Sequence, residues 1–244
     1  MAQSARRAAI LDVDGTLVDS NDAHARAWVE ALTEKGHHVT FDQIRRLIGM
    51  GGDNLLPTVI GKEKDSPEGK ELSDLWDQIF KTKYQPNLKP FPQVPQLFER
   101  LRERGLQRVI ASSATQEQLD ALLKIAGVTG LVDATVSADD IGTSKPAPDA
   151  VEVALKKAGC APEQAIMVGD TPYDIESAGK AGVKTIAVRC GGWSDEDLKG
   201  AIALYDDPAD LLAHLDEERA FRVAWSAVEN KYEKDEKSGQ WKAK

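Results

Sequence analysis

The feature that most constrains the fold of this chain is a repeated alternation of two kinds of segment. Five short runs rich in Ile, Val and Ala are each followed by small or polar residues and then by a helical pattern. The runs are Ala8–Val13, Arg108–Ser113, Val132–Ser137, Ala165–Asp170 and Thr185–Arg189. Strands that alternate with helices are typical of a parallel sheet that helices cover on both faces. The sequence therefore predicts an α/β fold.

Helices are predicted where apolar residues recur three and four positions apart. This spacing predicts helices over Val94–Glu103, Gln116–Ala126 and Pro148–Ala158. Between about residues 20 and 89 the chain has helical patterns but no convincing strand. Those patterns cover Ala23–Glu34, Phe41–Ile48 and Leu72–Tyr84, with a loop over Gly61–Gly69.

An all-helical block inside an α/β chain indicates an inserted subdomain. We expect a core made of residues 1–19 and 90–215, a helical cap made of residues 20–89, and a charged, partly helical tail over residues 216–244. Several prolines between Pro86 and Pro95 would stiffen the return from the cap to the core. The tail could begin with an amphipathic helix carrying Phe221, Val223, Trp225 and Val228, and its end is expected to fray.

Composition excludes several classes of protein. Lys and Arg total 31 against 40 Asp and Glu, giving a net charge of −9, the opposite sign from a typical nucleic-acid binder. No apolar run approaches the about 18 residues that a membrane helix needs, and the N-terminus does not suit a signal peptide. Cys160 and Cys190 are too far apart in sequence to suggest a zinc motif. We expect a cytoplasmic protein that binds neither nucleic acid nor membrane.

Four motifs follow the predicted strands and carry groups suited to phosphate and metal chemistry. They are D-V-D-G-T from Asp12, I-A-S-S ending at Ser113, S-K-P around Lys145, and G-D-T-P-Y-D from Gly169 to Asp174. Taken singly, each has a structural explanation as a turn, a helix cap or a solvated side chain. Taken together they are more informative, because the carboxyl ends of parallel strands converge on one ligand-binding crevice. Acid, hydroxyl, lysine and acid in that order predict a phosphate and metal site.

With these motifs the chain resembles the haloacid dehalogenase-like (HAD) superfamily over roughly residues 8 to 212. All four motifs of that family occur in order, and D-x-D-G-T together with G-D-x-x-x-D is highly specific. The helical block between the first two motifs resembles the family's C1 cap, as in the phosphoglycolate phosphatase and β-phosphoglucomutase branch. The resemblance implies a Rossmann-like parallel-sheet core with an inserted all-helical C1 cap.

The resemblance also implies a role for each motif residue. Asp12 would attack phosphorus and form an aspartyl-phosphate, and Asp14 would act as general acid and base. Ser112, Ser113 and Lys145 would bind the transferred phosphoryl group. Magnesium would be held by Asp12, the Asp14 backbone carbonyl and Asp170, with Asp174 as a further ligand or as support. The expected enzyme is a Mg²⁺-dependent phosphatase for a small-molecule phosphomonoester, working as a monomer or homodimer.

The cap is expected to select the leaving group through the loop Ile48–Asp53, and its candidate substrate residues are His24, Arg45, Gly51, Gly52 and Asp53. Two other functions stay open. A phosphosugar mutase of the β-phosphoglucomutase type holds a second phosphate with a cap arginine, but our alignment places Gly52 there. His24 lies at the position of a mutase hinge histidine, which a phosphatase can share. A non-catalytic phospholigand-binding protein should have lost an essential residue, and none is missing.

Overall fold

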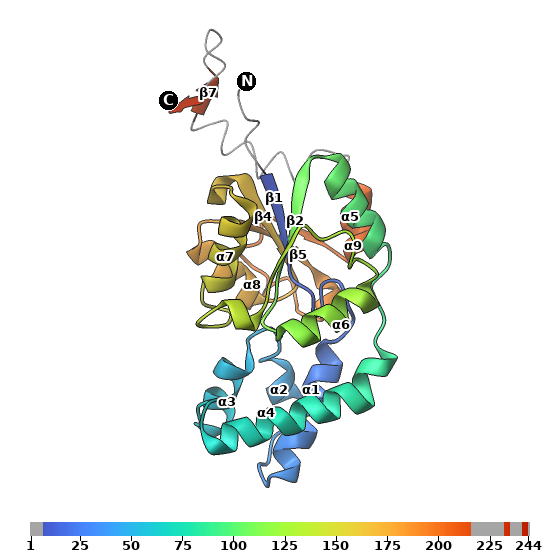
Figure 1. Cartoon of the computed structure of the whole chain (residues 1–244), viewed down its shortest axis with the longest axis vertical. Coiled ribbons are helices and arrows are strands. Elements are labelled where there is room, and N and C mark those ends of the chain that lie inside the picture. Colours follow the sequence, from blue (N-terminus) through green and yellow to red (C-terminus); the bar gives the residue numbers. More distant parts are fainter. Residues whose placement is uncertain (1–6, 216–231, 235–240, 244) are drawn as a thin grey trace.

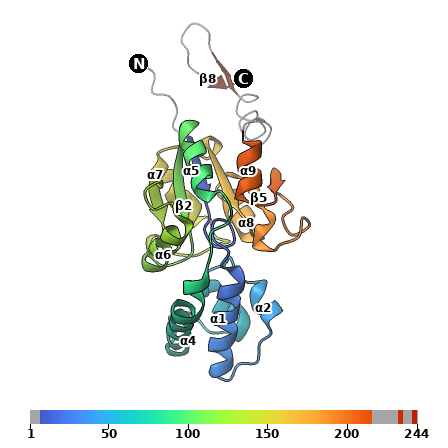
Figure 2. The same cartoon turned by 90° about the vertical axis from the view of Figure 1, so that its right-hand side faces the viewer.

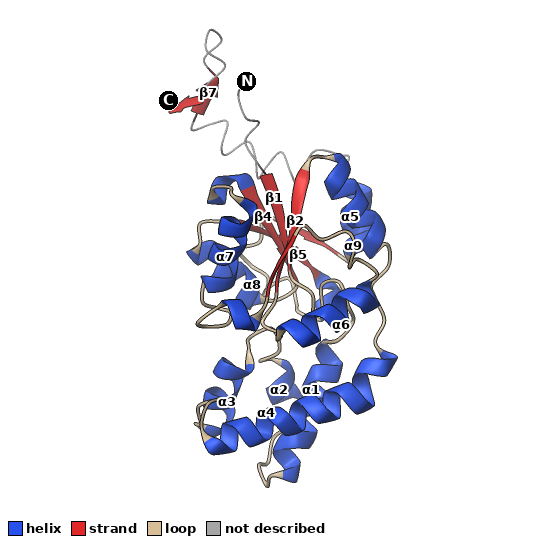
Figure 3. Cartoon of the chain, in the orientation of Figure 1, coloured by secondary structure: helices blue, strands red, loops and turns tan. Residues whose placement is uncertain are grey.

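A six-stranded, all-parallel sheet forms the centre of the molecule (Figure 3). The structure is a computed structural model that describes residues 7–215, 232–234 and 241–243. The strands are β1 (Arg7–Leu11), β2 (Leu106–Ala111), β3 (Ala134–Val136), β4 (Ala165–Gly169), β5 (Lys184–Val188) and β6 (Ala203–Tyr205). Their spatial order is β3-β2-β1-β4-β5-β6, so the winding reverses between β1 and β4. This doubly wound sheet confirms the predicted Rossmann-like fold.

Helices cover both faces of the sheet, as Figure 1 shows. The helices of the core are α5 (Val94–Glu103), α6 (Gln116–Ala126), α7 (Asp149–Ala158), α8 (Pro172–Lys180) and α9 (Pro208–His214). The side chains of β1 alternate between two apolar clusters. Ala9 and Leu11 pack with α5, α6 and α9, whereas Ala8 and Ile10 pack with α7 and α8. Because both faces are buried, the strand reads as a continuous apolar run in the sequence.

The helices between β1 and α5 form a separate layer below the core, and Figure 2 shows α1 and α4 side by side in it. They are α1 (Asn21–Glu34), α2 (Phe41–Arg45), α3 (Gly52–Ile60) and α4 (Pro67–Ile79), which continues as a π-helical turn over Phe80–Tyr84. They bury an apolar cluster of their own around Trp28, Leu56 and Leu72. We call this layer the cap.

Two chain segments join the cap to the core, and they lie against each other. The amide of Asp19 donates to the carbonyl of Lys89 at 3.0 Å, and the amide of Phe91 donates to the carbonyl of Leu17 at 3.0 Å. Val18 and Pro90 form an antiparallel bridge between the same two segments. The chain therefore enters and leaves the cap through two segments that pair with each other. This paired connection is where the cap can hinge relative to the core.

The sequence predicted the long periodic helices better than the short elements. Helices α5 and α6 have the predicted bounds, whereas α3, β6 and α9 were not predicted. The sequence of α3 begins with a glycine and contains Pro57, both of which disfavour a helix interior. The loop predicted over Gly61–Gly69 ends earlier than expected, because Ser66 caps α4 through the Gly69 amide.

The described part of the tail is a short antiparallel pair, β7 (Tyr232–Lys234) and β8 (Trp241–Ala243). This differs from the frayed end that the charged sequence suggested, and both strands contain an aromatic residue, a type that favours strands. The predicted helix around Phe221–Val228 lies outside the described residues. Among the described residues, no helix is both long enough and apolar enough to cross a membrane.

Replacing Phe98 with alanine tests the packing of the core. Phe98 is fully buried on α5 in the apolar cluster that includes Leu11. We expect Phe98→Ala to lower the free energy of unfolding by about 3–5 kcal/mol, because it leaves a cavity in a close-packed core. Urea unfolding followed by circular dichroism measures the loss. The control is Gln96→Ala, at an exposed position of the same helix, and a Phe98→Ala loss as small as that of the control would contradict the packing.

Candidate active site

The strand-end residues of the sequence motifs meet at the edge of the sheet that faces the cap. Asp12 follows β1, Ser112 follows β2, and Asp170 follows β4. Backbone hydrogen bonds fix two of these turns: the Asp12 amide donates to the Val168 carbonyl at 2.9 Å, and the Ser112 amide donates to the Val136 carbonyl at 3.0 Å. The motifs therefore converge because neighbouring parallel strands end together.

Lys145 is completely buried among the carboxylates of this edge, with 1% of its surface exposed. Its Nζ donates a hydrogen bond to Asp12 Oδ1 and another to Asp174 Oδ1 at 2.7 Å. Burial acts to lower the pKa of Lys145, but the attraction of Asp12 and Asp174 outweighs it and holds that pKa above its ordinary value. Lys145 is thus a fixed positive charge that touches the predicted nucleophile.

Asp170 lies beside this pair and is also fully buried. It accepts hydrogen bonds from Thr16 Oγ1 at 2.9 Å and from Asn21 Nδ2 at 2.8 Å. Gly191 leaves the space that Asp170 occupies, because a Cβ at Gly191 would come within 1.7 Å of Asp170 Oδ2. Neither Thr16 nor Asn21 was among the predicted site residues, because the sequence does not show which hydroxyl or amide group will lie beside a buried carboxylate.

The three carboxylates form a compact group that suits a cation. One oxygen each from Asp12, Asp170 and Asp174 lies within 4.8 Å of the others. Burial raises the pKa of Asp12 to about 7 and raises that of Asp170 well above its ordinary value, and the charge of Asp174 adds to both increases. Lys145 balances only part of this buried negative charge. Oxygen ligands with excess negative charge are what a hard divalent cation prefers, so the residues fit such an ion.

The Asp14 side chain contacts residues at the start of the cap, not the carboxylate group of Asp12, Asp170 and Asp174. Its Oδ1 accepts a hydrogen bond from Ser20 Oγ at 2.5 Å and lies 2.8 Å from His24 Nε2. Burial acts to raise the pKa of Asp14, but His24 and Ser20 outweigh it, so that pKa lies below its ordinary value. The His24 ring stacks on Phe80, with centroids 4.0 Å apart. Asp14 is therefore tied to α1 through His24, and His24 in turn packs on the π-helical turn that follows α4.

The two serines after β2 are placed differently. Ser112 is buried, and its Oγ accepts a hydrogen bond from the Ala114 amide at 3.1 Å. The Oγ of Ser113 is also buried, but it has no hydrogen-bond partner in the structure. Ser113 lines the cavity described next, whereas Ser112 shapes the loop behind it. The Ser113 hydroxyl is thus a buried polar group without a partner, in a residue that lines the cavity.

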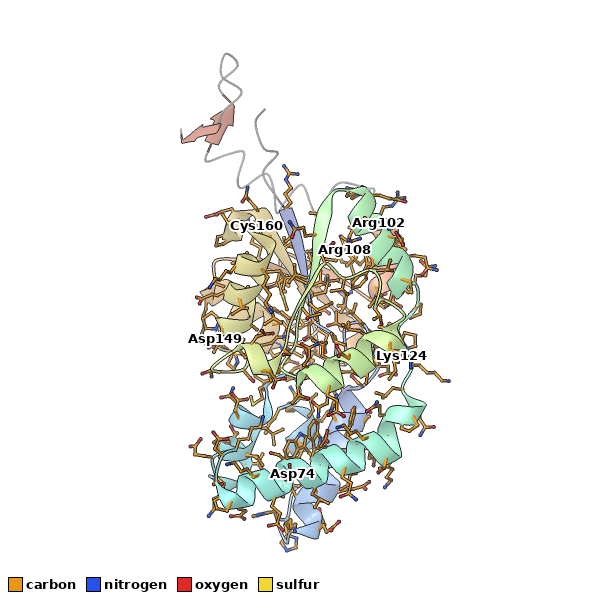
Figure 4. All side chains as sticks on the ribbon, in the orientation of Figure 1. Asp74, Arg102, Arg108, Lys124, Asp149 and Cys160 are labelled. Atoms are coloured by element: carbon orange, nitrogen blue, oxygen red, sulfur yellow. The ribbon has the colours of Figure 1, made fainter. Side chains whose placement is uncertain are left out.

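A cavity of 480 Å³ lies between the core and the cap. Asp12, Asp14 and Ser113 contribute to its core side. Cap residues close the other side; they are His24, Trp28, Ile48, Gly49, Met50, Gly51, Gly52, Lys64, Ser73, Asp74, Trp76, Asp77 and Lys81. Asp74 lies on α4, in the cap layer (Figure 4). Three of the five predicted cap residues, His24, Gly51 and Gly52, line this cavity.

The other two, Arg45 and Asp53, contact the core and do not line the cavity. Arg45 donates to Asp22 Oδ1 at 2.8 Å and to the Gly191 carbonyl. Asp53 Oδ2 accepts a hydrogen bond from the Ser144 amide at 2.9 Å. The sequence could not show whether these side chains contact the substrate or the core, because the direction of a loop side chain depends on how the cap packs on the core.

The start of α3 holds the loop that carries Lys145. Besides the Asp53 contact, Asn54 Nδ2 donates to the carbonyls of Ser144 at 3.3 Å and Lys145 at 3.1 Å. Gly51 permits this close approach, since a Cβ there would lie 2.3 Å from Ser144 Oγ. The start of α3 thus holds the Ser144–Lys145 segment, and Lys145 in turn binds Asp12.

Replacing Asp53 with alanine tests this contact. We expect Asp53→Ala to increase hydrogen exchange of the Ser144 amide about 10-fold, because the hydrogen bond to a carboxylate that protects it is lost. Peptide-level exchange followed by mass spectrometry measures this. Asp65→Ala, at an exposed position of the cap, is the control. Equal protection of Ser144 in both variants would show that α3 does not hold the loop.

Comparison with known proteins agrees with this geometry. The sequence profile described as haloacid dehalogenase-like hydrolase matches residues 9–188. The chain belongs to the haloacid dehalogenase-like hydrolase family. Phosphoglycolate phosphatase of Aquifex aeolicus (strain VF5) is 34% identical over 217 residues, covering 86% of this HAD-like chain and 97% of the relative. The match confirms the predicted family, its phosphoglycolate phosphatase branch, and the expectation of a HAD-like phosphatase.

Solved structures share the fold over most of the chain. A hydrolase from Pseudomonas syringae superimposes with a TM-score of 0.81 at 30% identity, covering 87% of this HAD-like hydrolase and 99% of that chain. A structure from Bacteroides vulgatus that is named for beta-phosphoglucomutase has a TM-score of 0.79, covering 91% of this chain and 90% of its own. At 24% identity the latter likeness concerns the fold alone.

A second profile, that of the family described as ChaB, matches residues 199–244. This match begins just before β6 and includes the charged tail. The HAD-like profile ends at residue 188, so the two matches do not overlap. The tail, which the resemblance to HAD-like proteins did not reach, thus has a sequence likeness of its own.

Proposed function

We propose that the protein is a Mg²⁺-dependent phosphatase that hydrolyses a small-molecule phosphomonoester through an aspartyl-phosphate on Asp12. The observation that carries this proposal is the placement of Asp12: it lines a cavity, touches a buried lysine, and has the pair Asp14–His24 beside it. A carboxylate that is oriented by a cation and open to a cavity is suited to nucleophilic attack.

The residues divide the reaction into two displacements. Asp12 attacks phosphorus, an Asp12–phosphate bond forms, and the ester P–O bond breaks. The pKa of Asp14 is low in the free protein, so the proton that it passes to the leaving alkoxide comes with the bound phosphomonoester, and the alkoxide departs as an alcohol. A water molecule then attacks the phosphorus and gives a proton to Asp14, the Asp12–phosphate bond breaks, and inorganic phosphate leaves. Both steps use Asp14 in opposite protonation states, and its contact with His24 keeps it beside the cap connection.

The phosphoryl group is held by donors that the chain supplies. Lys145 provides a positive charge next to Asp12, and the unpartnered Ser113 hydroxyl provides a hydrogen-bond donor on the cavity wall. Ser112 supports this position by binding the Ala114 amide and so fixing the turn. Donors placed where negative charge spreads in the transition state lower its energy.

The carboxylates of Asp12, Asp170 and Asp174, with the backbone carbonyl of Asp14, would hold the Mg²⁺ ion. When bound, the ion supplies positive charge that reduces the repulsion between the anionic nucleophile and the anionic substrate. Thr16 and Asn21 hold Asp170 in place through one hydrogen bond to each of its carboxylate oxygens. Asp174 is fixed in turn by hydrogen bonds from the Thr171 amide at 3.0 Å and from its hydroxyl at 2.7 Å.

Phosphate release tests the proposal. The purified protein with MgCl₂ should release phosphate from para-nitrophenyl phosphate and, more efficiently, from some member of a panel of metabolite phosphates. Addition of EDTA should abolish release, and excess Mg²⁺ should restore it. A protein that releases no phosphate from any of these esters, or that works equally well in EDTA, would contradict the proposal.

The mutase alternative has one specific observation in its favour, the contact of His24 with Asp14. Against it, Gly52 offers no side chain to hold a second phosphate where the mutase alignment expects an arginine. Conversion of a sugar 1-phosphate to the 6-phosphate faster than phosphate release would favour the mutase. Binding of phosphate esters without any turnover would favour the non-catalytic alternative, although Asp12, Asp14 and Lys145 are all in place.

A further inference from the structure

Asn21 connects the cap to the carboxylate group of the core. It is the first residue of α1, the first helix of the cap, and only 2% of its surface is exposed. Its Nδ2 donates to Asp170 Oδ2 at 2.8 Å and to the carbonyl of Gly191 at 3.2 Å. The other oxygen of Asp170 is bound by Thr16, in the turn after β1. One of the two donors that orient Asp170 therefore comes from the core and the other from the cap.

Two glycines leave the space that this contact needs. A Cβ at Gly15 would lie 2.1 Å from Asn21 Nδ2 and 2.3 Å from Asp170 Oδ2. Gly15 also has a φ of +74°, which a residue with a side chain rarely adopts. A Cβ at Gly191 would lie 1.7 Å from the same oxygen of Asp170. The backbone thus closes tightly around the Asn21 amide and the Asp170 carboxylate.

The Asn21 amide has one favourable orientation in this space. Its two neighbours, Asp170 Oδ2 and the Gly191 carbonyl oxygen, are both acceptors, so they select the NH₂ side of the amide. Asn21 Oδ1 is then left buried, with no hydrogen-bond partner among the described residues. A buried acceptor without a partner costs about 1–3 kcal/mol. The donors to Asp170 and Gly191 are therefore what an asparagine provides here and an apolar side chain of similar size would not.

Arg45 ties a second cap helix to the same point. It ends α2 and donates from Nη2 to the Gly191 carbonyl, which thus accepts from both Asn21 and Arg45. Its Nε donates to Asp22 Oδ1 at 2.8 Å, and Asp22 directly follows Asn21 on α1. The start of α1, the end of α2 and Gly191 therefore form one connected contact beside Asp170.

We propose that Asn21 is a positioning residue through which the cap sets the affinity of the cation site. This inference rests on the cation of the proposed function and adds a role for the cap in binding it. Groups that hydrogen-bond to a ligating carboxylate fix its direction, and their loss costs about 10–100-fold in metal affinity. Because Asn21 belongs to α1, a displacement of that helix removes its donor from Asp170. By linkage, a bound cation stabilises the cap position that keeps this contact.

Titration of Mg²⁺ into the protein without substrate tests the role of Asn21. Asn21→Ala removes the donor, and Asn21→Leu removes it while filling the space, so the pair separates the lost hydrogen bond from lost packing. We expect isothermal titration calorimetry to give a Kd for Mg²⁺ about 10–100-fold higher in both variants. A melting temperature in EDTA within about 4 °C of wild type shows that a variant is folded.

The control for this titration is Asn87→Ala. Asn87 is an exposed asparagine on the other segment that joins the cap to the core, and its Nδ2 donates to the Lys83 carbonyl at 3.2 Å. Its replacement should change the Kd for Mg²⁺ less than about 2-fold, because it touches no group of the site.

Arg45→Met tests the link to the cap without changing a group that touches Asp170. It keeps the aliphatic stem and removes the donor from α2 to the Gly191 carbonyl. We expect the Kd for Mg²⁺ to rise about 3–10-fold, since the effect passes through Gly191 and Asn21. The matched control is Arg46→Met, because Arg46 contacts the core at Asp197 instead, at 3.4 Å. An Arg45→Met effect no larger than that of Arg46→Met would overturn the link to the cap.

Hydrogen exchange followed by NMR measures the reciprocal effect. The amide of His24 donates to the Ser20 carbonyl at 2.9 Å in the first turn of α1. Saturating Mg²⁺ should slow its exchange about 10-fold in wild type and leave it unchanged in Asn21→Ala, because the coupling acts equally in both directions. The amide of Leu97, which donates to the Gln93 carbonyl at 2.9 Å at the start of α5, should exchange at the same rate with and without Mg²⁺.

These measurements separate the inference from the proposed function, because none of them needs turnover. Weaker Mg²⁺ binding in Asn21→Ala and Asn21→Leu than in Asn87→Ala supports the inference even if no ester is hydrolysed. Equal Mg²⁺ affinity in Asn21→Ala and Asn87→Ala, or exchange at His24 that Mg²⁺ leaves unchanged in wild type, would overturn it even if the protein is an active phosphatase. A wild-type protein that binds no Mg²⁺ would overturn both.

Discussion

Replacing Asp12 with asparagine is expected to reduce phosphate release by at least about 10³-fold, because the attacking carboxylate is lost. The fold should be little affected. Asparagine has nearly the same shape, Lys145 keeps its contact with Asp174, and burial already opposes the charge on Asp12. We expect the melting temperature of Asp12→Asn to lie within about 4 °C of wild type, the largest shift that about 1 kcal/mol produces in a protein of this size. Steady-state kinetics and differential scanning calorimetry measure the two effects.

The matched control is Asp19→Asn, which changes an exposed aspartate shortly after the motif. It should leave kcat/KM within about 3-fold of wild type, because surface substitutions away from special features have small effects. A stable Asp12→Asn variant that turns over as fast as Asp19→Asn would remove Asp12 from the chemistry. An unfolded Asp12→Asn variant would contradict the view that its carboxylate serves the reaction more than the fold.

The second large effect is expected at Lys145, whose loss should reduce both stability and activity. Lys145→Met would leave Asp12 and Asp174 buried without the cation that they share. Breaking a buried ion pair by removing one partner costs about 3–5 kcal/mol, and we expect a loss of this size in the free energy of unfolding measured in EDTA. Phosphate release should fall by at least about 10³-fold, because the charge beside the phosphoryl group is gone.

A double variant separates the two effects. Lys145→Met combined with Asp174→Asn removes one of the stranded carboxylates and should recover at least about half of the lost stability without recovering activity. Lys124→Met, at an exposed lysine on α6 outside the cavity wall, serves as the control for loss of a lysine charge. A Lys145→Met protein as stable as this control would contradict the buried ion-pair group.

The sequence could predict the edge of the sheet where the chemistry lies because that edge depends on local patterns. Parallel strands and their following polar residues are readable from apolar runs, and the structure does bring Asp12, Lys145, Asp170 and Asp174 together. The long helices α5 and α6 were equally readable, since each presents a full apolar face. Short elements such as β6 and α9 have too few residues to show a period.

Side-chain direction on the cap could not be predicted, because it depends on how two layers pack. Arg45 and Asp53 have the charges expected of substrate contacts, yet they contact the carbonyl of Gly191 and the amide of Ser144. Lys64 did not stand out in a loop that contains several charged residues. In the structure Lys64 packs over Gly52 and lines the cavity, whereas Lys62 is exposed and paired with Glu68.

The central claim is that the phosphoryl group passes through Asp12, and chemical trapping tests it most directly. The protein is mixed with Mg²⁺ and excess para-nitrophenyl phosphate, quenched in acid during turnover, and reduced with borohydride, which converts an aspartyl-phosphate to homoserine. Peptide mass spectrometry then locates the reduced residue. We predict homoserine at position 12 and at no other aspartate. Turnover with no reduced residue, or with reduction at a different aspartate, would contradict the account.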